Sequence, residues 1–299
     1  MNILPDLVRA NTIHPPKWLP DNTAYLCYMG SHAYGVADDD SDLDVYGFCI
    51  PPIDVVFPHL DGEIPGFGSQ VQRFEQWQEH HAKAPGKDVV YDLSVYSIVK
   101  YFQLAMQNNP NMIDSLFVPR RCILHSTPLF EHLRENRRLF LHKGSWHKFK
   151  GYAYSQMSKI KGKVNAASPR RATSIQTHGY DVKFAYHLVR LLCEVEQIMV
   201  EGDLDLEKNT PQLRSIRRGE WTLPFLEAWF SDKEKALETV YASSSLQHSP
   251  DEAVIRQLLL ECLEMHYGSL DSVVKKDPSA DRLVSVIRTA IETYEKARS

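Results

Sequence analysis

Two aspartates, Asp42 and Asp44, stand two positions apart in a stretch whose apolar and polar residues alternate, as they do in a β-strand. Residues i and i+2 of a strand point to the same face of the sheet, so both carboxylates are expected to project together. Hard oxygen ligands placed in this way suit Mg²⁺ or Mn²⁺, and two close carboxylates repel each other unless a cation lies between them. The pair therefore predicts a divalent metal site.

A turn with Gly30 and Ser31 precedes this strand and follows a mostly apolar run over 21–29, which predicts a buried strand. Glycine allows close approach of the backbone to a ligand, and a helix that starts after Ser31 would offer N–H groups to an anion. A phosphate-binding turn beside a divalent metal is the arrangement that a nucleoside triphosphate needs. Three further aspartates belong to the connecting turn and are expected to stay in water: Asp38, Asp39 and Asp40.

The Gly30-Ser31 turn followed by Ser41-Asp42-Leu43-Asp44 resembles the signature of the DNA polymerase β-like nucleotidyltransferase superfamily. The fuller pattern is similar to one branch, the YcgL-type nucleotidyltransferases, also described as the RNA-repair-pathway polymerase β family. Further similar blocks extend the resemblance from about residue 25 to about 220, at 92–101, 109–117, 151–156 and 187–192. The resemblance implies a palm-type catalytic domain, a divalent metal ion and an NTP substrate.

The resemblance also implies a third carboxylate on a neighbouring strand, which would complete the metal site and receive the proton of the attacking hydroxyl. Asp88 and Asp92 both fall in a strand predicted over 88–93, and their spacing of four places them on the same face. Parity therefore cannot choose between them. The family block aligns better on Asp92, so Asp92 is the preferred residue and Asp88 stays as the alternative.

Two predicted helices carry polar stripes that suit nucleotide binding. In the helix predicted over 178–201, side chains three or four positions apart share one face, and that face carries Tyr180, Lys183, His187 and Arg190. The cations there are expected to bind the β- and γ-phosphates, unless they form an ordinary solvated face. Phe184 on the other side is predicted to be core. A second stripe is expected to contact the nucleotide or a polynucleotide backbone: Tyr152, Gln156, Lys159 and Lys163.

Basic residues are concentrated in the middle of the chain. From Glu131 to Arg190 there are 13 Lys and Arg against 3 Asp and Glu, a local balance of +10 in a chain whose net charge is −4. This asymmetry predicts one basic face that meets an anion such as phosphate or nucleic acid. The alternative is helical surface charge that happens to cluster.

Other site patterns are missing from the sequence. There is no Gly-x-x-x-x-Gly-Lys-Ser/Thr loop and no Gly-x-Ser-x-Gly elbow, which argues against P-loop enzymes and α/β-hydrolases. The five cysteines are far apart and form no Cys-x-x-Cys pair, so they are expected to be free thiols in a reducing compartment. His80 and His81 are predicted to be an exposed loop pair and not zinc ligands.

The predicted elements give an α+β fold in two domains. Residues 1–135 are expected to form a catalytic domain with a small mixed β-sheet, and residues 136–299 an all-helical domain that closes the cleft. Residues 54–87 are predicted to be an irregular insertion with at most a short helix or strand around 70–78.

No apolar run approaches the roughly 20 residues of a membrane span, and the N-terminus lacks a secretory pattern, so a cytoplasmic protein is expected.

The expected reaction is transfer of a nucleotide from an NTP to a hydroxyl group, with an RNA 3′ end, such as that of tRNA in repair or end processing, as the preferred acceptor. One alternative is nucleotidylation of a protein or a small molecule. Another is a catalytically silent module that binds nucleotide or RNA. The intact pair of Asp42 and Asp44 argues against the silent module, because clustered carboxylates repel each other without a function to keep them. The sequence leaves the choice of NTP and the oligomeric state open.

Overall fold

The computed structural model describes residues 2–38, 41–56, 73–83, 89–162, 169–268, 286–289 and 294, apart from the side chains of 169–171. At its centre is a five-stranded sheet with the order β3-β4-β2-β1-β5. β2 and β4 are parallel, and the other neighbouring strands are antiparallel. The strands are β1 (Thr23–Tyr28), β2 (Leu43–Cys49), β3 (Gln76–Lys83), β4 (Val90–Ser97) and β5 (Ile123–Ser126).

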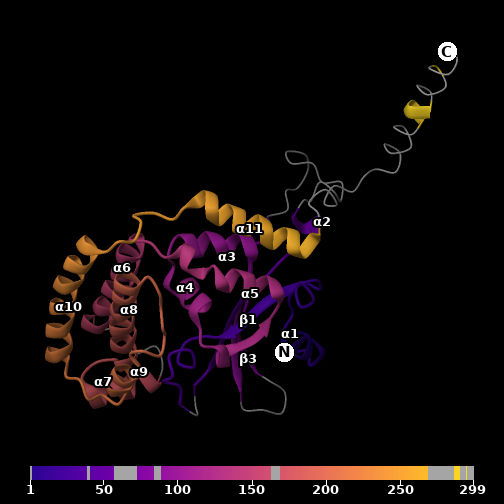
Figure 1. Cartoon of the computed structure of the whole chain (residues 1–299). Helices are drawn as coiled ribbons and strands as arrows, with labels where there is room; N and C mark the ends of the chain where they lie inside the picture. The colour runs from indigo at the N-terminus through magenta and orange to yellow at the C-terminus, as the bar shows by residue number, and fades with distance from the viewer. Residues whose placement is uncertain are drawn as a thin grey trace.

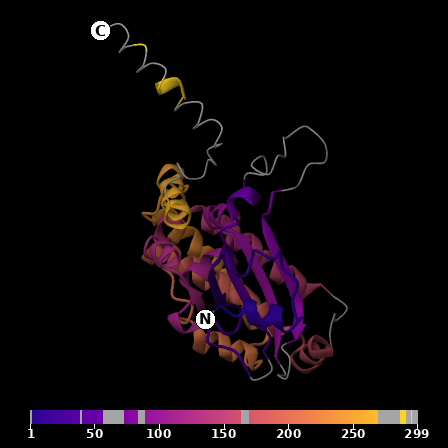
Figure 2. The ribbon, with the colours of Figure 1, turned by 90° about the vertical axis from the view of Figure 1, so that its right-hand side faces the viewer.

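The two faces of the sheet are covered differently (Figure 1). Three helices pack on one face: α3 (Ile98–Met106), α4 (Pro110–Phe117) and α5 (Pro128–Glu135). The other face is covered by α1 (Leu4–Arg9) and the segment after it, and Figure 2 shows the sheet from this side, with the remaining helices behind. Successive residues of β1 pack into different hydrophobic cores. Tyr25 packs into the core beneath α3, α4 and α5, and Leu26 into the core beneath α1, because successive side chains of a strand point to opposite faces.

The second half of the chain is helical. α6 (Gly144–Lys161) and α8 (Val182–Glu201) lie side by side, and α7, α9 and α10 surround α8 (Figure 1). Their bounds are α7 (Pro169–His178), α9 (Thr210–Arg217) and α10 (Leu223–Ser243). α11 (Glu252–Tyr267) returns to pack on α5 and α3. The predicted α+β fold is confirmed. None of the helices in the described part of the chain has the length and apolar character that crossing a bilayer requires.

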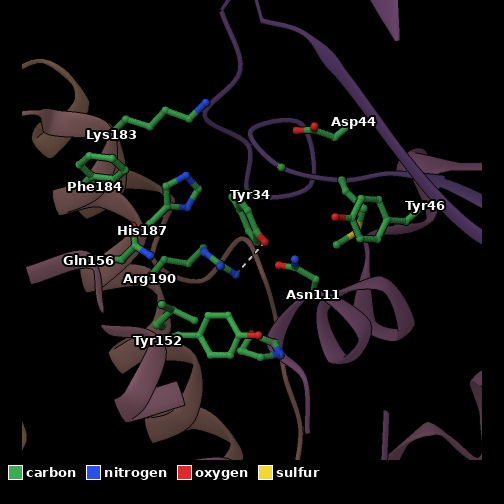
Figure 3. A pocket seen from close by; sticks show the side chains of 14 residues that line it. Tyr34, Asp44, Tyr46, Asn111, Tyr152, Gln156, Lys183, Phe184, His187 and Arg190 are labelled. Atoms are coloured by element: carbon green, nitrogen blue, oxygen red, sulfur yellow. Dashed lines mark hydrogen bonds between the residues drawn. The ribbon is translucent and has the colours of Figure 1, made fainter. Parts of the chain in front are cut away.

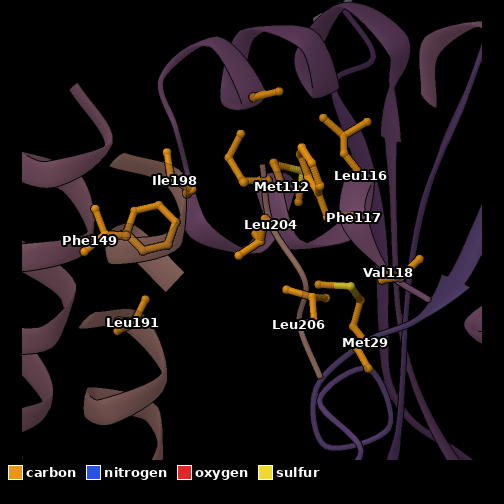
Figure 4. Packing of buried hydrophobic residues seen from close by; sticks show 14 of the residues in the cluster. Met29, Met112, Leu116, Phe117, Val118, Phe149, Leu191, Ile198, Leu204 and Leu206 are labelled. Carbon is orange, nitrogen blue, oxygen red and sulfur yellow. The ribbon is translucent and has the colours of Figure 1, made fainter. Parts of the chain in front are cut away.

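The sheet half and the helical half share one hydrophobic core (Figure 4). Met29, Met112 and Phe117 from the first half meet Phe149, Leu191, Ile198, Leu204 and Leu206 from the second. Burying such side chains is worth roughly 1.5–3 kcal/mol each, so this junction stabilises the placement of the two halves. The domain boundary after residue 135 stays a prediction, because the core runs across it.

The prediction for residues 54–87 needs a correction. β3 lies in this segment, extends further than the expected short element and contains His80 and His81, which were predicted to be a loop pair. β3 is an edge strand, and most of its side chains are exposed, so its sequence lacks the apolar alternation that marks a strand. Its register shifts between Glu79 and Ala82, and His81 adopts a left-handed φ of 57° there.

Candidate active site

Two of the predicted carboxylates meet on the central strands. Asp44 of β2 is the direct register partner of Asp92 of β4, and paired residues of parallel strands send their side chains to the same face. Asp44 is partly buried, and the Asp92 side chain is 27% exposed. Asp42 lies one residue before β2 begins and is exposed. Asp88 lies outside the described residues. The register therefore singles out Asp92 as the neighbour of Asp44.

The carboxylates repel each other. Burial raises the pKa of Asp44, and the charges of Asp92 and Asp42 raise it further, while Lys183 and His80 oppose the shift. A divalent cation would relieve this repulsion, and carboxylate oxygens are the ligands that Mg²⁺ and Mn²⁺ prefer, so the donor chemistry fits the predicted metal. Within the described part of the chain, no three His, Cys, Asp or Glu side chains already form a metal-binding group.

The bulge of β3 holds the carboxylate of Asp92. The backbone N–H of His81 donates to Asp92 Oδ1 at 2.8 Å. The Nδ1 atoms of His80 and His81 lie 3.6 Å and 3.8 Å from the same oxygen. The sequence analysis missed this role of the histidine pair, because β3 itself was not predicted over these residues. An adjacent His-His in a polar segment is the only signal that could have suggested it.

The turn at Gly30 touches the carboxylate of Asp44. Gly30 has a left-handed φ of 59°, and a Cβ atom placed on it would overlap Asp44 Oδ2. The Met29 N–H also donates to the Asp44 carbonyl oxygen at 2.8 Å. Glycine is therefore required here for both conformation and space. Residues 31–35 form a turn and not the short helix that was expected.

A cavity of about 340 Å³ opens beside this turn, between the sheet half and the helical half (Figure 3). Its lining joins Gly30 and Asp44 to five side chains that the two helical stripes predicted, namely Tyr152, Gln156, Lys183, His187 and Arg190. Phe184 also lines it and is only partly buried, so its prediction as core was wrong. Ser31 and Lys159 do not line it, although the Lys159 Nζ lies 5.3 Å from the centroid of the Phe184 ring.

The chain matches the model of one protein family. A family model described as the RNA repair pathway DNA polymerase beta family matches residues 5–226, which include the carboxylates, the turn and both cavity-lining helices. The chain belongs to this family.

This polymerase β family chain also shows similarity to a curated phage protein and to a solved structure. An uncharacterized 38.9 kDa protein of enterobacteria phage T4 is 26% identical over 149 residues, which are 48% of this chain and 41% of that protein. The chain thus spans less than half the length of this curated relative. A solved nucleotidyltransferase-like protein from Exiguobacterium sibiricum 255-15 is 10% identical, with 80% of this chain and 73% of that chain covered and a TM-score of 0.29.

In this family member, Arg190 is held by carboxylates inside the protein. Its guanidinium pairs with Asp114 and with Glu194, the latter at 3.0 Å, and donates to the Tyr34 hydroxyl at 2.7 Å (Figure 3). All these side chains are buried. Burial raises the pKa of Asp114 and Glu194, and Arg190 opposes the rise. The charge of Arg190 is thus already balanced within the chain, which weakens its predicted role with phosphates.

Lys183 and His187 differ in charge. The Lys183 side chain is exposed at the mouth of the cavity. Burial lowers the pKa of His187 well below its usual value, and the charges of Arg190 and Lys183 lower it further, so His187 is neutral at pH 7. Tyr180 precedes α8 and donates to the Trp221 carbonyl oxygen at 2.7 Å, away from the cavity. Lys183 is therefore the cation of the stripe that is placed to meet a phosphate.

The helical half also forms hydrogen bonds and an ion pair with the turn that follows Gly30. Thr210 Oγ1 donates to the Tyr34 carbonyl oxygen at 2.8 Å, and Arg214 donates to the Gly35 carbonyl oxygen at 2.7 Å. Arg217 pairs with Asp38 at 2.5 Å, while the Asp38 side chain remains 61% exposed, as expected. The sequence analysis missed these residues of α9, because their partners are more than 170 positions away in the chain.

Part of the predicted basic face is neutralised within the chain. Lys150 of α6 lies 2.8 Å from Glu234 and 2.7 Å from Glu238 of α10, and Lys161 lies 3.2 Å from Glu227. The expectation of one uniform basic face is therefore wrong for this side of α6. Lys163 lies outside the described residues.

Proposed function

We propose that this chain transfers a nucleoside monophosphate from an NTP to a hydroxyl group, with an RNA 3′ end as the acceptor. The observation that carries the proposal is the cavity itself. It places the Gly30 turn and Asp44, the register partner of Asp92, opposite Lys183 of the helical half. A site of this composition can hold a triphosphate beside paired carboxylates, as nucleotidyl transfer requires.

Each residue of the site has a distinct part in this reaction. Asp44 and Asp92, with Asp42 beside them, would hold Mg²⁺ or Mn²⁺, which would neutralise the triphosphate charge. Gly30 lets the backbone approach the phosphates, with Ser31 next to it, and Lys183 offers a positive charge. Asp92 would accept the proton of the acceptor hydroxyl. The acceptor oxygen then bonds to the α-phosphorus, the bond between that phosphorus and the leaving oxygen breaks, and pyrophosphate leaves.

The acceptor is proposed from the family to which the chain belongs, whose description places it in RNA repair. A tRNA 3′ end is one such acceptor. Transfer to a protein or a small molecule uses the same chemistry and is the alternative. A silent binding module is disfavoured, because the partly buried carboxylate of Asp44 beside two others lowers the stability of the site without a metal.

The test uses purified protein, Mg²⁺ or Mn²⁺, each α-labelled NTP in turn and a total RNA pool. The Asp42→Ala/Asp44→Ala double variant runs beside it, with Asp21→Ala, an exposed acidic residue away from the cavity, as the matched control. Label that enters RNA with the wild type and Asp21→Ala, but not with the double variant, supports the proposal and names the nucleotide.

Two other outcomes have clear meanings. If RNA stays unlabelled while NTP binds only with metal, RNA is not the acceptor, and two possibilities remain: transfer to a protein or a small molecule, or a silent binding module. If no NTP binds with either metal, the proposed reaction is wrong. RNA as acceptor also predicts that binding weakens steeply as salt rises, because counterions are released at each phosphate contact, whereas a small neutral acceptor shows little dependence.

A further inference from the structure

The two ends of the cavity differ in charge (Figure 3). Asp44 and Lys183 lie at one end, beside Gly30. Tyr152 lies toward the other end, with Gln156 on the same helix and Asn111 across from them at the start of α4. The charged end suits a triphosphate and its metal. The second end offers amides and an aromatic ring.

The second end stays neutral although Arg190 is close to it. Asp114 and Glu194 balance the Arg190 charge, and Tyr34 accepts one of its hydrogen bonds. An arginine that is buried and paired in this way is costly to release, because its partners would be left as unpaired charges. This end of the cavity therefore favours an uncharged ligand group with hydrogen-bonding edges over a second phosphate.

The side chains at this end suit a ligand with a planar, polar ring. Tyr152 lines the cavity and is 45% exposed, so its side chain is accessible to a ligand there. The Gln156 amide offers a donor and an acceptor side by side. Asn111 contributes a second amide, which contacts the Tyr46 hydroxyl. The cavity volume of about 340 Å³ falls within the range of small-molecule sites.

We infer that this end of the cavity binds the nucleobase of the NTP, with the ring stacked on Tyr152 and one edge bonded to Gln156. The inference rests on the proposed function and names its substrate more closely. An amide matches an edge where a donor lies beside an acceptor, as N6–H and N7 do in adenine. At the N7 edge guanine instead presents two acceptors, N7 and O6, which a cation binds better than an amide does. At this edge the Gln156 amide therefore favours adenine over guanine, and ATP over GTP.

The test measures dissociation constants in Mg²⁺ for ATP, GTP and inorganic tripolyphosphate, which has no base. Tyr152→Ala is expected to weaken ATP binding roughly 5- to 150-fold, the usual effect of losing one stacked base. Gln156→Glu has the same shape and a carboxylate that accepts from both guanine donors, so it is expected to move the ATP to GTP preference roughly 5- to 150-fold toward GTP. Tyr152→Ala should leave tripolyphosphate binding unchanged. The charge added by Gln156→Glu repels all three anions alike, so this effect cancels in the ATP to GTP ratio.

The controls separate this inference from the proposed function. Ser155 is exposed on the same helix and does not line the cavity. The Ser155→Ala variant should therefore bind all three ligands like the wild type. Lys183→Ala should weaken all three together. If tripolyphosphate binds but Gln156→Glu leaves the ATP to GTP ratio unchanged, the nucleobase site is overturned and the triphosphate site stands. If none of the three ligands binds to the wild type, both proposals fail.

Discussion

Asp44 of β2 and Asp92 of β4 are direct register partners on two parallel strands, so their carboxylates leave the same face of the sheet side by side. This relationship joins residues 48 positions apart and defines where metal and substrate would meet. It also makes the empty site electrostatically unfavourable, because the pKa of Asp44 is raised by burial and by the charge of Asp92.

Asp92, and not Asp88, is predicted to be the third carboxylate of the reaction. Asp92→Asn should lower nucleotidyl transfer by on the order of 10²-fold or more, since it removes both a metal ligand and the proton acceptor. Asp88→Asn should leave transfer close to wild type. Label incorporation under saturating NTP measures both variants. The reverse order of effects would move the assignment to Asp88.

Asp44→Asn is predicted to separate stability from activity. Replacing a buried, repelled carboxylate with an amide should raise the free energy of unfolding of the metal-free protein by roughly 0.5–2 kcal/mol, while transfer is lost. The gain should appear at pH 7 and vanish at a pH below about 3.8, where Asp44 is protonated even in the unfolded chain. Urea unfolding at several pH values measures this. A lower stability at pH 7 would contradict the repulsion described above.

Gly30→Ala is predicted to damage the site through Asp44. The new Cβ would overlap the Asp44 carboxylate, and the left-handed φ of 59° costs a non-glycine residue about 1–2 kcal/mol. Gly151→Ala is the control, because its Cβ would point into open space on helix α6 and should stabilise the protein by roughly 0.5–1 kcal/mol. The thermal unfolding temperature and the NTP affinity should both fall for Gly30→Ala, and neither should fall for Gly151→Ala.

Substitutions at Arg190 and Lys183 are predicted to have different effects, the first on stability and the second on triphosphate affinity. Arg190→Met leaves Asp114 and Glu194 buried without their cation and should destabilise the protein by about 3–5 kcal/mol. Lys183→Ala removes an exposed side chain, so stability should stay within about 0.5 kcal/mol while triphosphate affinity falls. Denaturant unfolding and tripolyphosphate titration give the two readouts. Equal stability losses would show that Lys183 also has a structural part.

His187 is predicted to make the protein less stable in acid. Its pKa in the folded protein is well below the usual value near 6.5, so below about pH 6.5 the unfolded chain binds a proton that the folded chain does not. The free energy of unfolding should therefore fall as pH decreases from 6.5, by at most about 1.4 kcal/mol per pH unit from this residue. His187→Gln should remove this part of the slope. His248→Gln, an exposed histidine, should not change it.

Local patterns were enough to predict much of the candidate site. The alternation around Asp44 placed it on a strand, and the spacing of Tyr152 and Gln156, and of Lys183, His187 and Arg190, placed each set on one helix face. All of these side chains line one cavity, whereas Tyr180 and Lys159 of the same predicted stripes do not, and Lys163 lies outside the described residues. Periodicity succeeds here because a helix or strand fixes which of its own side chains share a face, whatever the rest of the fold does.

Periodicity does not say what those faces meet. The carboxylates, the glycine turn and the two stripes could be predicted from local patterns alone. The folded structure was needed to show that Asp92 is the register partner of Asp44, that the β3 bulge holds Asp92, and that Glu234 and Glu238 neutralise Lys150. It also decided that Arg190 pairs with Asp114, 76 residues away. These contacts depend on how distant segments pack, and packing is a property of the whole core that no single segment encodes.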